Sequence, residues 1–359
     1  MTLTPLRSRR GSTNVEVGLF TFGDLFPDPV TGRVPSAQQR LGEILAVAEL
    51  ADRYGLDLFG VGEHHSSLFA ISSPVTVLAA IATATRRIRL SSAVTILSSA
   101  DPVRVFQEFA TLDLLSGGRA EIMAGRGAFT ESFPLFGYRL EDYEMLFEEH
   151  LDLLLRVNEA TPVTWSGHHR PALAKAEITP RPVQQALPIW LAVGGTPTSV
   201  VRAGRLGLPM TLGLIGGMSE RFAPLAELYR RTGREAGHDD AALQIGITGH
   251  FYVAATRAQA YEEFYPHYAA YLRVVSRSRG QEWRVSRADF QSLASLPGVL
   301  FVGDPDDIVA KVNYQHELFG HSRFMAQHDV GGLGYAKVAS SVQLLASEVV
   351  PAVRELMPA

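Results

Sequence analysis

An acidic residue and two histidines stand directly after a short apolar run, in the sequence Gly62-Glu63-His64-His65. Ionisable side chains at the exit of a buried strand cost stability unless they are used or satisfied. Because successive residues of a strand point to opposite sides, one of His64 and His65 should face the mouth of a barrel. A metal site, a structural histidine and a catalytic acid or base all remain open, although Glu63 is the one carboxylate nearby.

Glycine-rich sequences end two further apolar runs. Gly125-Arg126-Gly127 follows residues 120–124, and Gly194-Gly195-Thr196-Pro197-Thr198-Ser199 follows residues 188–193 and opens a helix. Glycines permit close backbone approach, hydroxyls donate hydrogen bonds and a helix N-terminus carries free N–H groups, so the second sequence suits a phosphate. Arg126 could supply the counter-charge. A helix cap after a tight turn needs the same residues and stays an alternative, and neither sequence is a P-loop or a dinucleotide fingerprint.

The chain alternates apolar strand-like runs with amphipathic helical stretches. We expect eight strands, at residues 15–20, 57–63, 89–97, 120–126, 188–194, 208–214, 243–253 and 322–328. Helix starts are marked by a capping side chain before proline at Ser73-Pro74, Asp101-Pro102, Thr196-Pro197 and Asp304-Pro305, and Gly55 should end the first helix. Eight such units predict an α/β fold of the (β/α)₈ TIM-barrel type. A doubly wound sheet uses the same units, but unusual chemistry after many strands favours the barrel.

Composition describes an ordinary soluble protein. The 359 residues are 46% hydrophobic and 19% charged with net charge −4, which gives no indication of a nucleic-acid or membrane partner. The absence of cysteine excludes disulfides and thiolate chemistry. We expect a cytoplasmic protein with a disordered extension at 1–14 and a single domain at 15–359. Insertions at about 160–187 and 276–298 could be lids or surface excursions.

Together these segments resemble the bacterial-luciferase-like flavin monooxygenases. The resemblance extends from about residue 15 to about residue 350. Besides the sequences around His64, Arg126 and Gly195, it is carried by Arg87-Ile88-Arg89-Leu90 with Ala93-Val94, Asp101-Pro102-Val103-Arg104, Leu112-Asp113-Leu114-Leu115-Ser116-Gly117-Gly118-Arg119, Thr179-Pro180-Arg181-Pro182-Val183-Gln184 and Gly331-Gly332-Leu333.

The resemblance implies reduced FMN bound at the carboxyl ends of the barrel strands. It implies a cis peptide bond at Ala93–Val94 beneath the flavin ring and a catalytic role for His64. Residues implied to bind the cofactor are Glu63, Ala93, Val94, Arg126, Phe129, Val193, Gly194, Gly195, Thr196 and Ser199, of which Arg126, Thr196 and Ser199 would contact the phosphate. No metal is implied. Two positions depart from luciferase: Phe129 replaces a tyrosine and Gly125 replaces a cysteine, so the substrate pocket should differ and light emission is not expected.

The function implied by the resemblance is a two-component monooxygenase. Reduced FMN from a separate NAD(P)H:flavin reductase would react with O₂ to give a flavin C4a-peroxide, with His64 as acid or base in oxygen transfer to a small organic substrate. A homodimer or larger homo-oligomer is expected. An oxidoreductase that uses coenzyme F420, and a flavin-binding protein without turnover, are the alternatives.

Overall fold

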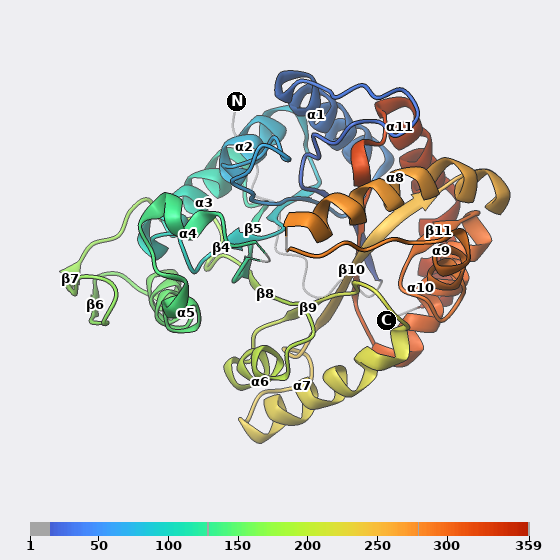
Figure 1. Cartoon of the computed structure of the whole chain (residues 1–359). Helices are drawn as coiled ribbons and strands as arrows, with labels where there is room; N and C mark the ends of the chain where they lie inside the picture. The colour runs from blue at the N-terminus through green and yellow to red at the C-terminus, as the bar shows by residue number, and fades with distance from the viewer. Residues whose placement is uncertain (1–14, 128, 279, 358–359) are drawn as a thin grey trace.

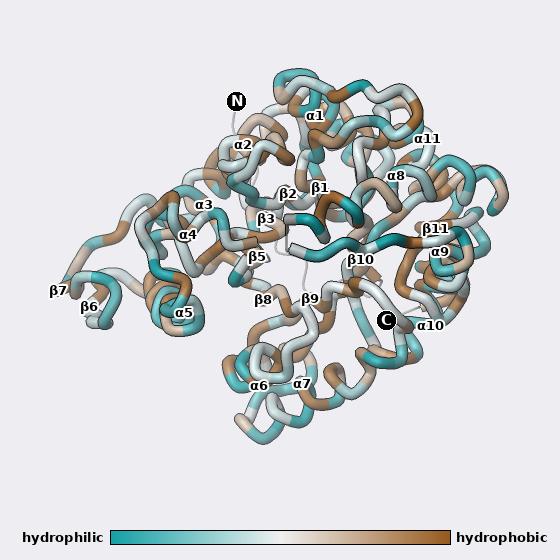
Figure 2. Tube along the Cα trace, in the orientation of Figure 1, coloured by the Kyte–Doolittle hydropathy of each residue, from teal (hydrophilic) through white to brown (hydrophobic). Residues whose placement is uncertain are grey.

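The computed structural model describes residues 15–127, 129–278 and 280–357 (Figure 1). The extension expected at 1–14 lies outside the described residues. Among the helices of the described ranges, none is long and apolar enough to cross a membrane. Figure 2 shows hydrophilic and hydrophobic residues interspersed along the outer helices, which is the pattern of helices that cover a core on one side only.

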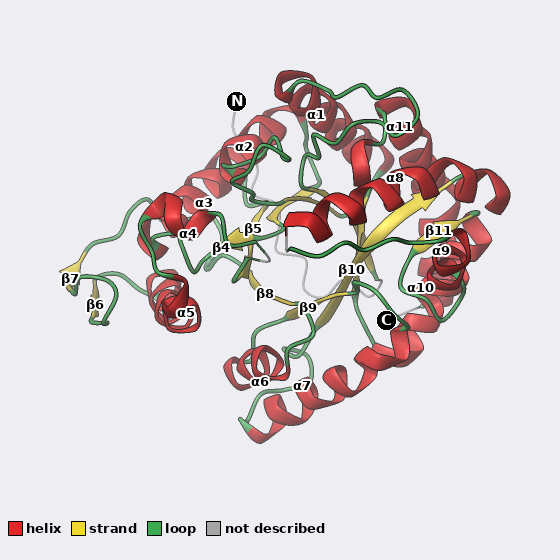
Figure 3. Cartoon of the chain, viewed as in Figure 1, coloured by secondary structure: helices red, strands yellow, loops and turns green. Residues whose placement is uncertain are grey.

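Eight parallel strands pair into a closed barrel. Figure 3 shows the barrel strands at the centre of the molecule, with helices around them. In spatial order they are β1 (Glu16–Thr21), β2 (Leu58–Val61), β3 (Arg89–Ser92), β5 (Ala120–Gly125), β8 (Ile189–Val193), β9 (Met210–Gly213), β10 (Ile245–Val253) and β12 (Arg323–Gln327). β12 pairs with both β10 and β1, which closes the barrel. The predicted TIM-barrel fold and all eight predicted strands are therefore confirmed.

Two short strands extend this barrel. β4 (Thr95–Ile96) pairs with β5, and β11 (Phe301–Gly303) pairs with β10 beyond the point where β12 ends. The strand predicted at 89–97 is thus divided into β3 and β4, and the Ala93–Val94 peptide bond between them is cis. The structure confirms the cis bond that the family resemblance implies.

The lower part of the barrel is filled with side chains. Arg323 is buried and binds Glu121 at 2.7 Å and Glu16 at 2.7 Å, while its guanidinium lies 3.9 Å from the centre of the Trp190 ring. An apolar layer lies above this ion pair network, consisting of Phe20, Leu58, Ala93, Met123, Trp190 and Met325. The filled floor leaves the carboxyl ends of the strands as the face available to a ligand.

Helices surround the barrel. They are α1 (Ala37–Tyr54), α2 (Pro74–Ala84), α3 (Pro102–Ser116), α4 (Ser132–Phe136), α5 (Tyr143–Glu159), α6 (Pro197–Leu206), α7 (Ala223–Glu235), α8 (Arg257–Ser278), α9 (Arg287–Ala294), α10 (Pro305–Phe319), α11 (Tyr335–Leu344) and α12 (Val350–Leu356). Short 3₁₀ turns are η1 (Leu140–Asp142), η2 (Ser219–Phe222) and η3 (Val330–Gly332), and η4 (Leu345–Val349) is a π-helical turn.

Two of the four predicted helix caps form. Asp101 and Asp304 accept hydrogen bonds from backbone N–H groups of α3 and α10, and Gly55 ends α1 at φ +79° as expected. The prediction was wrong for Ser73, whose hydroxyl bonds to the Thr76 hydroxyl at 2.7 Å, and for Thr196, whose side chain makes no capping bond. The N-terminus of α6 is therefore left uncapped by its own threonine.

The two insertions have different structures. Residues 160–187 contain an antiparallel pair, β6 (Val163–Trp165) and β7 (Leu173–Ala176), which projects beyond α5 at the edge of the molecule (Figure 1). Residues 276–298 include the end of α8 and all of α9, which has a capping box between Ser286 and Asp289. Residues 280–286 between these two helices and residues 295–298 after α9 are irregular, so the second segment is partly helical and partly loop.

Candidate active site

His64 lies after β2, at the carboxyl end of the barrel, in a cage of aromatic rings. Its ring stacks on Phe69 with centroids 4.0 Å apart and meets the edges of Phe22 at 4.8 Å and Phe129 at 4.9 Å. The imidazole is 7% exposed, and its Nδ1 atom is buried without a hydrogen bond. Phe129, which the family resemblance implies as a ring contact for the cofactor, therefore lies beside the predicted catalytic residue.

The adjacent Glu63 and His65 form a separate pair. Glu63 Oε1 lies 2.8 Å from His65 Nε2, and Glu63 Oε2 accepts a hydrogen bond from the Ile96 backbone N–H at 2.9 Å. Both carboxylate oxygens of Glu63 thus have protein partners, and they join the end of β2 to β4. Within the described part of the chain, no group of three or more histidines and carboxylates is arranged to hold a metal ion.

The Ala93–Val94 segment packs tightly against the end of β5. A Cβ atom placed on Gly125 would lie 2.8 Å from Val94 Cγ2, a separation that real structures do not show. Val94 therefore occupies the space that a larger residue at position 125 would need. Gly125, which replaces the luciferase cysteine, and Val94 consequently form one tightly packed unit at the barrel mouth.

The segment between β8 and α6 presents open space and a buried hydroxyl without a partner. A Cβ atom added at Gly194 would meet no atom within 4 Å, and Gly195 adopts φ +103°, which favours glycine. Ser199 is 7% exposed and its Oγ atom is buried without a hydrogen bond. Buried hydroxyls are normally satisfied, so an unpartnered one in the first turn of α6 is available to donate a hydrogen bond, beside backbone N–H groups that favour an anion.

Two arginines converge on this helix through a shared carboxylate. Arg126, directly after β5, forms an ion pair with Glu144 of α5, and Arg202 of α6 lies 3.4 Å from the same carboxylate and 2.6 Å from Glu148. One nitrogen of Arg202, Nη1, is buried without a hydrogen bond. Arg126 is therefore brought to the neighbourhood of α6, as the phosphate hypothesis requires, and its present partner is Glu144.

The side chain of Val193 does not face the barrel interior. It packs in the layer between strands and helices, whereas its neighbour Ala192 packs with the residues inside the barrel. A contact between Val193 and a cofactor at the barrel mouth would therefore involve its backbone.

Helix α8 was not expected at the site, yet it covers part of this end of the barrel. Tyr271 of α8 contacts the rings of Phe26, which follows β1, and His250 of β10, with centroids 5.5 and 5.2 Å apart. His267 of α8 lies 3.0 Å from the carbonyl oxygen of Gly331, which follows β12. Burial lowers the pKa of His250 to about 4, so it is neutral at physiological pH. The sequence pattern of α8 indicates that a helix forms, but it does not indicate against which strands that helix packs.

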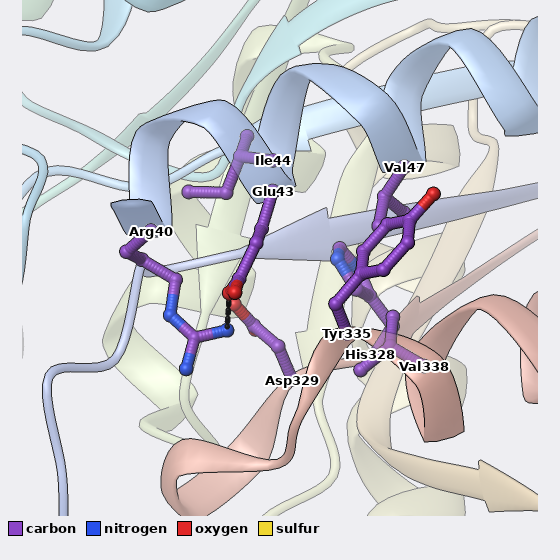
Figure 4. Close-up of a pocket in the computed structure, with 8 residues that line it drawn as sticks. All are labelled: Arg40, Glu43, Ile44, Val47, His328, Asp329, Tyr335 and Val338. Carbon is purple, nitrogen blue, oxygen red and sulfur yellow. Dashed lines mark ion pairs between the residues drawn. The ribbon is translucent and has the colours of Figure 1, made fainter. Parts of the chain in front are cut away.

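A second polar cluster lies outside this site, between α1 and α11 (Figure 4). A cavity of about 10 Å³, room for a single water molecule, is lined by the ion pair of Arg40 and Glu43 and by His328 and Asp329, which follow β12. Asp329 accepts a hydrogen bond of 2.6 Å from Thr21. The cluster joins the ends of β1 and β12 beside the mouth.

A family model described as luciferase-like monooxygenase matches residues 15–322. The chain belongs to this family. The expected membership is thus confirmed, and with it the general class of oxidoreductase. Curated relatives of named activity align over about three fifths of their length: 4-hydroxyprotoasukamycin monooxygenase of Streptomyces nodosus subsp. asukaensis is 29% identical over 231 residues, 61% of each chain.

Solved structures of the same fold cover nearly the whole chain. Monooxygenase RslO1 of Streptomyces bottropensis is 25% identical with a TM-score of 0.81, covering 94% of this chain and 99% of that one. The FMN-bound oxygenating constituent of 3,6-diketocamphane monooxygenase from Pseudomonas putida gives 20% identity and a TM-score of 0.75, covering 94% and 98%. An F420-dependent secondary alcohol dehydrogenase is 19% identical with a TM-score of 0.71, and the match covers 95% of this chain and 99% of that one.

Proposed function

We propose that this protein is an FMN-dependent two-component monooxygenase acting on a small organic substrate. The observation that carries the proposal is the anion cradle at the N-terminus of α6, defined by Gly194, Gly195, Thr196 and Ser199, with Arg126 and Arg202 beside it. The unpartnered hydroxyl of Ser199 and the unpartnered Nη1 atom of Arg202, three residues apart on α6, fit a terminal phosphate group.

The other predicted residues would hold the ring system. Ala93 and Val94 would lie beneath it, with Phe129 and the Glu63 segment at its side, and the chemistry that reduced FMN supplies when bound is activation of O₂ at its C4a carbon. The phenyl rings of Phe22, Phe69 and Phe129 exclude water from His64, which would hold or move a proton at its Nε2 atom. The same rings offer an apolar surface to the substrate.

The proposal includes partners that follow from this chemistry. The reduced flavin would come from a separate NAD(P)H:flavin reductase, and O₂ would be the second substrate. A homodimer or larger homo-oligomer in the cytoplasm belongs to the same proposal. F420 is the alternative cofactor, because enzymes of this fold include an F420-dependent dehydrogenase.

Binding and oxygen consumption together test the proposal. Purified protein should bind FMN at micromolar concentration and should consume O₂ with enzymatically reduced FMN in the presence of a substrate from a panel of apolar ketones, aldehydes and phenols. In a control, chemically reduced FMN replaces the reductase, which shows whether oxygen consumption depends on this protein and its substrate instead of on the reductase. Selective binding of F420, seen as a bound absorption maximum near 420 instead of 450 nm, or failure to bind either cofactor, would contradict it.

A further inference from the structure

The two adjacent histidines have different carboxylate partners. His65 is bonded to Glu63, its neighbour two residues earlier, whereas His64 Nδ1 lies 3.6 Å from Oε1 of Glu131, the residue that precedes α4. The second pair joins segments 67 residues apart and is not visible in the sequence. A small rotation of the Glu131 side chain brings the Nδ1–Oε1 distance within hydrogen-bond range.

Among the described residues, the Glu131 carboxylate faces Nδ1 of His64 at 3.6 Å. Three phenyl rings surround the imidazole, and its Nδ1 atom is buried without a hydrogen bond. The ionisable groups closest along the chain, Glu63 and His65, are bonded to each other. In this apolar cage a carboxylate acts on the imidazole through a medium that screens charge weakly.

Glu131 is maintained as a carboxylate. Burial raises the pKa of Glu131, but its contact with His64 and backbone N–H groups outweighs burial and leaves the pKa below its ordinary value. One of these groups is the His65 N–H, which donates to Glu131 Oε1 over 3.4 Å. A fixed negative charge therefore faces Nδ1 at neutral pH.

We propose that Glu131 is the positioning residue for His64. Its carboxylate accepts a hydrogen bond from Nδ1–H, which fixes the tautomer with the lone pair on Nε2 and stabilises the imidazolium after Nε2 takes a proton. Nε2 removes one proton from the reacting group and later returns it, while the Nδ1–H bond stays intact. The catalytic use of this pair rests on the proposed function; the pair itself does not.

An NMR titration of His64 in the flavin-free protein tests the pair. We compare the wild type with Glu131→Gln, which keeps size and an acceptor oxygen but removes the charge, and with Glu131→Asp, which keeps the charge. Glu141→Gln is the matched control, because Glu141 is 72% exposed and pairs with Arg139. The His64 titration midpoint should fall in the Gln variant, because the imidazolium loses the carboxylate that faces Nδ1, and it should stay near the wild-type midpoint in the Asp and control variants.

An unchanged midpoint in Glu131→Gln, with the fold retained by circular dichroism, would overturn the proposal. A fall of the same size in Glu141→Gln would also overturn it, because the effect would then be one of net charge. Since the titration contains no flavin or substrate, failure of FMN binding would contradict the proposed function and leave this pair standing. With turnover established, the acidic limb of the pH–kcat profile should move in the same direction as the midpoint.

Discussion

Replacing Arg126 with alanine should weaken FMN binding and leave riboflavin binding nearly unchanged. Arg126 follows β5 at the barrel mouth, its side chain is 20% exposed, and Glu144 joins it to Arg202 on the helix that begins with the anion cradle. Riboflavin has the same ring system and ribityl chain as FMN but no phosphate. The difference between the two ligands therefore isolates the contribution of the phosphate.

The size of the effect follows from the type of bond that is lost. A hydrogen bond between charged groups contributes about 1.5–3 kcal/mol. Arg126 must release Glu144 before it binds a phosphate, so we expect the lower part of that range, about 1.5–2 kcal/mol, which is roughly 10- to 30-fold in Kd. The riboflavin Kd should change by about twofold or less, well under 1 kcal/mol.

Fluorescence titration of both ligands against wild type and variant measures this difference. Arg139→Ala serves as the control, because its side chain is 74% exposed and pairs with Glu141 and Asp142 on the surface. Equal losses for FMN and riboflavin would show that Arg126 maintains the pocket instead of binding phosphate. No loss for either ligand would remove Arg126 from the site altogether.

Three further predictions concern charge, packing and acid stability. Glu144→Gln should tighten FMN binding several-fold, because the carboxylate competes with the phosphate for both arginines; weaker binding in the same titration would contradict this. Gly125→Ala should lower unfolding stability by about 1–3 kcal/mol through the clash with Val94, and an unchanged Tm would count against it. Burial lowers the pKa of His321 to about 3, so the unfolded chain binds a proton below pH ~6.5 that the folded chain does not. Stability therefore falls on acidification. Between pH 6.5 and 4.5, the unfolding free energy of His321→Leu, measured by urea denaturation, should fall less steeply with decreasing pH than that of the wild type, by up to about 1.4 kcal/mol per pH unit. Equal slopes for the two proteins would refute the assignment.

Much of the barrel was predictable because its signals are local. Most of the buried parallel strands are largely apolar runs between turn residues, although β3 (Arg89–Ser92) ends in two serines and β12 (Arg323–Gln327) has a polar residue at each end. The helix caps were predictable in two of four cases. Ser73 and Thr196 are residue types that often cap helices, but the Ser73 hydroxyl bonds to Thr76 and the Thr196 side chain makes no capping bond. That choice depends on tertiary surroundings.

The candidate site could be proposed from the sequence where strand ends carry unusual residues, but not where distant segments meet. His64, Arg126 and Ser199 stand in short distinctive sequences, and the resemblance to a known family assigned them roles. Glu131 and Arg202 are single charged residues without a motif, and their importance comes from contacts across 67 and 58 residues. Sequence periodicity carries no information on such contacts.

A crystal structure with FMN bound is the most direct test of the central claim, that the carboxyl end of this barrel is a flavin site. We predict that the phosphate lies within hydrogen-bond distance of Ser199 Oγ and the backbone N–H groups at the start of α6, with Arg126 turned from Glu144 toward it. The ring should lie against Ala93–Val94 with its reactive edge toward His64. A phosphate bound elsewhere, with Ser199 still unpartnered, would contradict the account.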